Sequence, residues 1–117
     1  MTISFDDIVV AARTGNTALL QQCTPDDVVH IDINKQIENQ NTFFNHSTVL
    51  LTAVKNGYST VILELHRLFG DKVDCNATEF QNDNALMIGA THGHADCITT
   101  LYNTYGNKIN HKNVNGC

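Results

Sequence analysis

Apolar and polar positions repeat along this chain with a fixed period. Residues 48–58 (TVLLTAVKNGY) and residues 84–94 (NALMIGATHGH) place a leucine, a small residue and a glycine at the same positions, and 93 − 57 = 36 residues separate the two glycines. A third copy with less detail, DDIVVAARTGN, covers residues 6–16. A period of this length is typical of a stack of small supersecondary units, and such a stack presents one long surface that can bind other molecules.

Each copy predicts two helices. The first ends near the shared glycine, as helices commonly do. In the second, apolar residues lie four, five and eight positions after that glycine, which places them on one face of a helix. These residues are Leu19, Leu20 and Cys23 in the first copy, Val61, Ile62 and Leu65 in the second, and Cys97, Ile98 and Leu101 in the third. We expect this face to be buried against the neighbouring unit.

Two capping signals add detail to the first copy. Ser4 is followed three residues later by Asp7, which predicts a capping box at the start of the first helix. The link from the first to the second copy is longer, because 57 − 15 = 42. It contains Thr24 and Pro25, which favour an extra helical turn with Thr24 as its cap.

This order of helix, glycine, helix and long turned loop resembles the ankyrin repeat. That family has a repeat of about 33 residues, with a T-P-L-H-x-A motif at the start of the first helix. The second copy keeps the motif's threonine, leucine and alanine as Thr48, Leu50 and Ala53, whereas the third keeps Leu86 and has Gly89 in place of the alanine. The resemblance extends over nearly the whole chain.

The sequence also departs from the family pattern. Both copies lack the proline and the histidine of the motif, so we expect repeats that are less stable than consensus ones. Gly93 and His94 match the family's Gly-His pair, whereas the other copies keep only the glycine. The tetratricopeptide repeat is the nearest alternative by period, but its pattern includes a tryptophan and this chain has none.

The resemblance implies an all-α solenoid of stacked helix-turn-helix units joined by β-hairpin-like loops. We expect one domain over residues 1–117, with units at about 4–34, 35–76 and 77–113, and with 114–117 as the start of a further repeat. Solenoids carry a polar capping repeat at each end. No such cap is visible at the C-terminal end, so we expect a longer natural chain or association through that end.

Composition limits the choice of partner. The 117 residues include 12 acids and 7 bases, which give a formal net charge of −5, and the bases form no cluster. Nucleic acids and anionic membranes attract clustered Lys and Arg, so neither is expected as the main partner. The chain has no apolar run long enough to span a membrane and no signal peptide. The cytoplasm is therefore the expected location, with Cys23, Cys75, Cys97 and Cys117 reduced.

The resemblance implies binding of a protein partner on the concave face, through hairpin tips and the exposed side of the first helices. The tip positions are Phe44, Asn45 and Ser47 in the second copy and Phe80, Gln81 and Asp83 in the third. The helix positions are Arg13 and Thr14, Lys55 and Asn56, and Thr91 and His92. Phe44 and Phe80 occupy equivalent positions, and two neighbouring exposed rings would form a binding hot spot. The alternative is that each ring folds back over its own repeat.

Metal binding and catalysis are weaker interpretations. His92, His94 and Cys97 are potential ligands, but zinc requires about four ligands that converge on one point. Cys97 occupies a predicted core position, and His94 a structural one in the resemblance, so we expect no metal and no cofactor. Cys23 also lies on a predicted core face, and no nucleophile elbow or phosphate-binding loop occurs. We therefore expect no enzyme within these residues.

The favoured interpretation is a module for protein–protein interaction. The main alternative is a non-catalytic targeting arm of a larger protein whose activity lies beyond residue 117, for instance a bacterial effector enzyme that acts in the host cytosol. A third is a structural spacer that associates with itself. The sequence identifies no particular partner.

Overall fold

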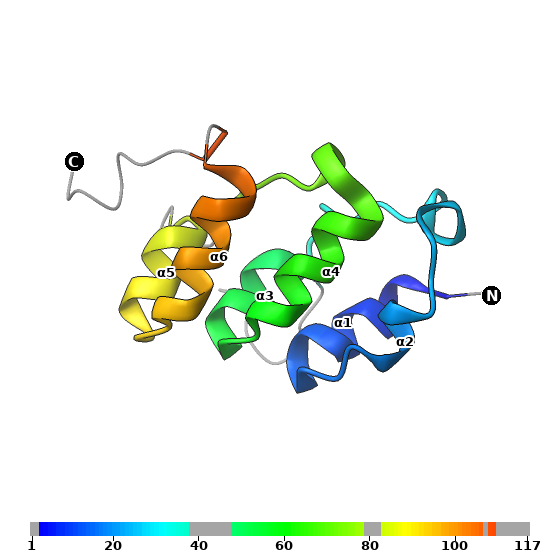
Figure 1. The fold of residues 1–117 in the computed structure, drawn as a ribbon, viewed down its shortest axis with the longest axis horizontal. Helices are drawn as coiled ribbons and strands as arrows, with labels where there is room; N and C mark the ends of the chain where they lie inside the picture. Colours follow the sequence, from blue (N-terminus) through cyan, green and yellow to red (C-terminus); the bar gives the residue numbers. More distant parts are fainter. Residues whose placement is uncertain (1–2, 38–47, 79–82, 107, 110–117) are drawn as a thin grey trace.

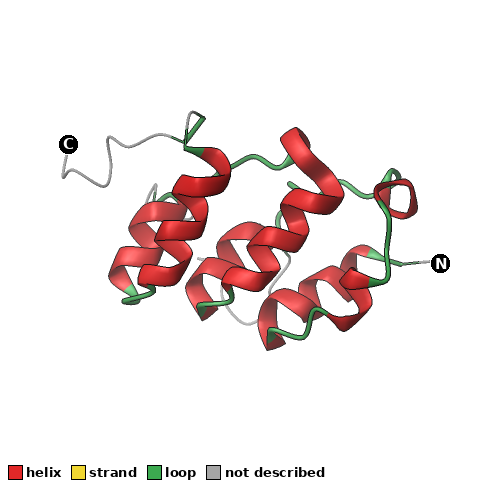
Figure 2. Cartoon of the chain, viewed as in Figure 1, coloured by secondary structure: helices red, strands yellow, loops and turns green. Residues whose placement is uncertain are grey.

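The computed structural model describes residues 3–37, 48–78, 83–106, 108 and 109. Three helix pairs stand side by side, and no strand occurs among the described residues (Figures 1 and 2). The first helices of the pairs are α1 (Phe5–Thr14), α3 (Val49–Asn56) and α5 (Ala85–Thr91). The second helices are α2 (Ala18–Gln21), α4 (Ser59–Phe69) and α6 (Ala95–Tyr105). Two short 3₁₀ helices follow α2 and α4: η1 (Pro25–Val28) and η2 (Gly70–Lys72).

The pairs form two rows. In one row α3 packs against both α1 and α5, and in the other α4 packs against α6. We call the row of α1, α3 and α5 the inner row, and the row of α2, α4 and α6 the outer row. This arrangement confirms the predicted all-α stack. The linking loops 38–47 and 79–82 lie outside the described residues.

A polar side chain begins each inner helix. The hydroxyl oxygens of Ser4 and Thr48 accept hydrogen bonds from backbone N–H groups three residues later, both at 3.3 Å, and the amide oxygen of Asn84 does the same at 3.0 Å. These bonds satisfy N–H groups that have no partner within the helix. The capping box of Ser4 and Asp7 is present as predicted.

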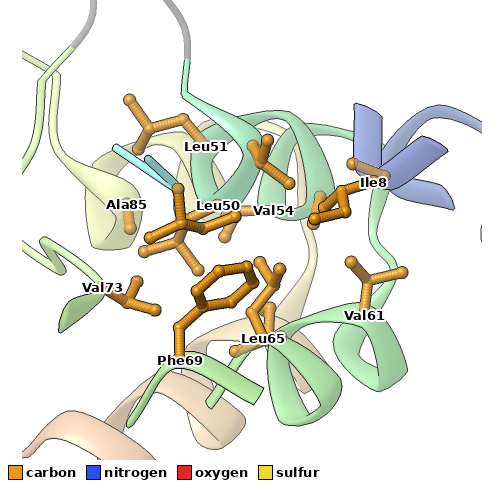
Figure 3. Close-up of a cluster of buried hydrophobic side chains, with 14 of the residues drawn as sticks. Ile8, Leu50, Leu51, Val54, Val61, Leu65, Phe69, Val73 and Ala85 are labelled. Atoms are coloured by element: carbon orange, nitrogen blue, oxygen red, sulfur yellow. The ribbon is translucent and has the colours of Figure 1, made fainter. Parts of the chain in front are cut away.

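The core fills the space between the two rows. In Figure 3, Leu50 and Val54 of α3 lie close to Leu65 and Phe69 of α4, and Ile8 of α1 borders the cluster. These side chains are 0–5 % exposed. Burial of one such side chain stabilises the fold by about 1.5–3 kcal/mol, so the apolar pattern of the sequence accounts for the stacking.

The predicted buried face of the second helices is largely confirmed. Seven of its nine residues are buried, and Ile98 is partly buried against the core. Leu19 was expected to be buried, but it is 36 % exposed, so that prediction is wrong. The reason is that α2 has only four residues, and the chain then enters the predicted turn, in which Thr24 and Asp27 form a capping box and Pro25 occupies the first position.

A side chain of the second unit caps the short helix α2. The Arg67 guanidinium on α4 donates to the backbone carbonyls of Leu20 at 2.6 Å and Cys23 at 2.9 Å. Its Nε also donates to the Glu64 carboxylate at 2.7 Å. Cations are favourable at the carboxyl end of a helix, where carbonyl groups lack partners. Arg67 thus fastens the first unit to the second.

Asparagine side chains connect the loops that follow the second helices. Asn34 donates to the carbonyl of Lys72 and accepts from the N–H of Asp74, both at 2.7 Å. Asn76 occupies the equivalent position one unit later and donates to the carbonyl of Lys108 at 2.7 Å. The Lys108 ammonium also pairs with Asp71. Each unit is therefore hydrogen-bonded to the next at this end of the stack.

At the other end, a ring of one unit covers a glycine of the preceding unit. Gly15 and Gly57 have φ angles of 78° and 81°, the left-handed conformation that glycine adopts without strain. A Cβ atom placed on Gly57 would lie 2.8 Å from the ring of His94, and one on Gly15 would lie 2.7 Å from the ring of Tyr58. Only glycine leaves room for these rings.

Candidate partner-binding surface

The predicted partner-binding residues fall into two groups. Phe44, Asn45, Ser47, Phe80 and Gln81 lie outside the described residues, so the proposed aromatic hot spot stays a prediction. The others lie in described parts of the chain, on or beside the inner row: Lys55, Asn56, Asp83, Thr91 and His92.

Three side chains occupy equivalent positions at the carboxyl ends of the inner helices. Arg13 belongs to the last turn of α1, Lys55 to that of α3, and Thr91 is the last residue of α5. Arg13 and Thr91 are exposed, and Lys55 is half-buried. Because α3 packs against α1 and α5, one residue from each unit lies along the same edge of the stack. A binding partner could contact all three units at once.

One other predicted residue joins two helices, and another lies next to a helix cap. The side-chain amide of Asn56 donates to the carbonyl of Ala12 at 3.3 Å, so it ties α3 to α1 although the residue is exposed. Asp83 is half-buried and directly precedes Asn84, which caps α5. Contact with a partner at Asn56 would therefore compete with a contact that holds the stack together.

The two histidines of the third unit bind backbone carbonyls. His94 Nε2 lies 3.0 Å from the Lys55 carbonyl oxygen, and His92 Nδ1 lies 2.9 Å from that of Ile88. A carbonyl only accepts, so each of these nitrogens carries the proton. The two rings stack with centroids 6.2 Å apart and an interplanar angle of 13°. His92 is exposed, whereas His94 mainly connects two units.

The three cysteines among the described residues lie in the core. Cys97 is fully buried, and burial raises the pKa of its thiol, as it does for Cys23 and Cys75. A raised pKa disfavours the thiolate, which is the form that acts as nucleophile or metal ligand. No group of three His, Cys, Asp or Glu side chains that could hold a metal occurs among the described residues. No described helix has the length and apolar character to cross a membrane.

A groove that the sequence pattern did not predict lies beside α1. Phe5, Asp6, Val9 and Arg13 line it from the helix, and the segment 35–37 closes its other side, with a volume of about 340 Å³. The Lys35 ammonium lies 5.5 Å from the centroid of the Phe5 ring. Phe5 lies one position after the capping serine, and Lys35 follows the asparagine that joins neighbouring units. No motif indicates that the two meet.

Comparison with protein families identifies the class of this stack. The family model for ankyrin repeats (3 copies) matches residues 8–113, which is most of the chain. The chain therefore belongs to the ankyrin-repeat family, whose members are generally protein–protein interaction modules and are typically non-catalytic. Comparisons with curated proteins and with solved structures gave no significant match.

Proposed function

We propose that this chain binds a protein partner on the exposed edge of its inner row and on the adjoining hairpin tips. The observation that carries the proposal is the placement of Arg13, Lys55 and Thr91, one from each unit, along one edge of the stack. Their regular spacing suits an extended contact with another protein.

The rigidity of the scaffold supports this proposal. The units are joined by the Asn56 bond between inner helices and by the His94 bond from one unit to the next. Arg67 and Asn34 join them on the other side. A surface that is already ordered loses little conformational entropy when a partner binds. The inner row can therefore present side chains from three units in a fixed geometry.

Affinity capture with matched variants tests the proposal. The inner variant is Arg13→Gln/Thr91→Glu, and the control is Thr60→Glu/Thr99→Glu on the outer row. Each variant changes the net charge by −2, and all four positions are exposed. We expect proteins captured by the unmodified chain to be lost with the inner variant and kept with the control. Loss with the control alone would place the contact on the outer row and contradict the proposal.

The hairpin tips need their own variant. Phe44→Ala/Phe80→Ala should abolish capture if the two rings form the predicted hot spot, because large aromatic side chains dominate binding energy at such sites. Circular dichroism of this variant should show unchanged helix content. Capture that is unchanged by the double substitution would remove the tips from the proposed surface.

We propose that this contact forms in a reducing, cytoplasmic compartment. The support is chemical: the thiols of Cys23, Cys75 and Cys97 are buried in the core. Disulfides are rare in the cytoplasm, and burial protects these thiols from oxidation.

A further inference from the structure

Two neighbouring hollows meet at the amino end of α1. The first is the groove described above, between α1 and residues 35–37. The second has a volume of about 460 Å³ and is lined by Ile3, Phe5, Ile31 and Lys35, among others. Phe5 and Lys35 line both hollows, so the two form one continuous surface, which we call the N-terminal groove.

The first hollow is basic, although the chain as a whole is acidic. Arg13 and Lys35 face it together with one acid, Asp6, whereas the formal net charge of the chain is −5. Neither Arg13 nor Lys35 forms an ion pair with any residue that the structure describes. Arg13 is exposed, as is Lys35. Two cations are therefore available to an anionic group that enters this hollow.

The second hollow adds an apolar floor. Phe5 and Ile31 are partly buried and pack against the core. His30 forms one wall, and its Nε2 lies 3.1 Å from the carbonyl oxygen of Ile3. The acid in this hollow, Asp32, already accepts a hydrogen bond from the N–H of Asn34 at 3.1 Å. An apolar side chain could cover Ile31 and share the Phe5 ring with the Lys35 ammonium, which lies 5.5 Å from the ring centroid, without removing an existing hydrogen bond.

We propose that the N-terminal groove binds an acidic segment of the protein partner, with its carboxylates on Arg13 and Lys35 and a neighbouring apolar side chain on Phe5 and Ile31. The inference rests on the proposed function and specifies the chemistry of the partner. The guanidinium of Arg13 can bind a carboxylate through two parallel hydrogen bonds, and the ammonium of Lys35 contributes a point charge. The first hollow carries two cations and one acid, and Asp32 adds a second acid in the second hollow. The groove as a whole is therefore too weakly basic to compete for nucleic acid, which favours a peptide whose acids lie over Arg13 and Lys35.

Selection from a random twelve-residue peptide library displayed on phage tests this inference without a known partner. The unmodified chain is the bait, and selected peptides are then synthesised and measured by fluorescence anisotropy. The groove variant is Arg13→Gln/Lys35→Gln. The control, Lys72→Gln/Lys108→Gln, removes the same charge from exposed positions away from the groove. Thermal unfolding of both variants checks that the fold is retained.

We expect the selected peptides to be enriched in Asp and Glu beside an apolar residue, and to bind the groove variant about tenfold more weakly than the control, the loss that two exposed ion pairs give. Raising the salt concentration should weaken binding to the unmodified chain, since exposed charges are screened. Replacing the acids of a selected peptide by Asn and Gln should have the same effect as the groove variant.

The other outcomes separate this inference from the proposed function. Selected peptides that lack acids, or that bind the groove variant and the control equally, would overturn the groove. If those peptides were lost with Thr91→Glu/His92→Glu, binding on the inner row would stand. A selection without any enriched peptide would count against the groove, whereas affinity capture of whole proteins would still test the proposed function.

Discussion

Substitution of Gly57 by alanine tests how the units are joined. Gly57 has a φ of 81°, and a Cβ atom there would lie 2.8 Å from the Nδ1 and Cε1 atoms of the His94 ring. The ring cannot stay in place, because real Cβ contacts are longer. Its shift would disturb the hydrogen bond from His94 Nε2 to the Lys55 carbonyl, which is 3.0 Å long.

Two contributions give the expected loss in the free energy of unfolding. The left-handed conformation costs an alanine about 1–2 kcal/mol relative to glycine. Loss of the histidine hydrogen bond adds about 1 kcal/mol. We therefore expect Gly57→Ala to lower the free energy of unfolding by about 2–3 kcal/mol, a large part of the roughly 5–15 kcal/mol of a typical domain.

Gly93→Ala is the matched control. Gly93 has a φ of 74°, and a Cβ atom there would have no heavy atom within 4 Å. The backbone hydrogen bonds are equivalent at the two sites. The N–H of Tyr58 donates to the carbonyl of Ala53 at 2.9 Å, and the N–H of His94 donates to the carbonyl of Gly89 at 2.8 Å. Gly93→Ala should therefore cost only the backbone term of about 1–2 kcal/mol.

Urea unfolding followed by circular dichroism measures the difference in the free energy of unfolding, provided that its dependence on urea concentration has the same slope in both variants. Gly57→Ala should destabilise the chain by about 1 kcal/mol more than Gly93→Ala does. In a His94→Ala background, the two substitutions should become equal, because the ring is absent. Equal effects in the unmodified background would refute the argument that the ring requires a glycine at position 57.

Four further predictions concern Tyr105, Arg67 and the cysteines. The Tyr105 hydroxyl is buried without a hydrogen-bond partner among the described residues. In urea unfolding, Tyr105→Phe should therefore leave the free energy of unfolding unchanged or raise it by up to about 1 kcal/mol. A clear loss of stability would reveal a partner of the hydroxyl. Burial raises the pKa of Tyr105, so stability should fall as the pH rises above about 10, the ordinary tyrosine pKa, and Tyr105→Phe should reduce that fall. Arg67→Gln should lower the free energy of unfolding by about 1–2 kcal/mol, because it removes the cap of α2. Glu64→Gln loses only the partly exposed ion pair and should lower it by less than about 0.5 kcal/mol. Equal losses would contradict the capping role. Thiol labelling of the native chain should be much slower than labelling in urea at Cys23, Cys75 and Cys97, and rapid native labelling would contradict their burial.

The repeat pattern of the sequence predicted most of the fold. The shared glycines marked the ends of α1, α3 and the turn after α5, since a left-handed residue there needs glycine. Apolar spacing predicted the buried face of α4 and α6. It failed at Leu19, because the spacing rule assumes a full-length helix and α2 ends after four residues.

Contacts between units were harder to predict. Arg67 caps a helix that lies 44 and 47 residues earlier in the chain, and nothing in its local sequence indicates that contact. Asn34 and Asn76 were more accessible to prediction, because each follows an aspartate by two residues in the equivalent loop. The repeat pattern also places Tyr58 and His94 at equivalent positions, but it does not show that each ring covers the glycine of the preceding unit.

The candidate site was predicted only in part. Family resemblance identified the inner helix ends, and the structure places Arg13, Lys55 and Thr91 along one edge. The N-terminal groove was missed, because Phe5 and Lys35 are 30 residues apart and meet only after folding. The aromatic pair at positions 44 and 80 stays a prediction.

Hydrogen–deuterium exchange, measured by mass spectrometry on the chain alone and with a captured partner, would locate the surface that the partner covers. We expect slower exchange in α1, α3 and α5 and in the segment that carries Lys35 when the partner is bound, with little change in α4 and α6. Protection confined to α4 and α6 would contradict this expectation and place the partner on the outer row.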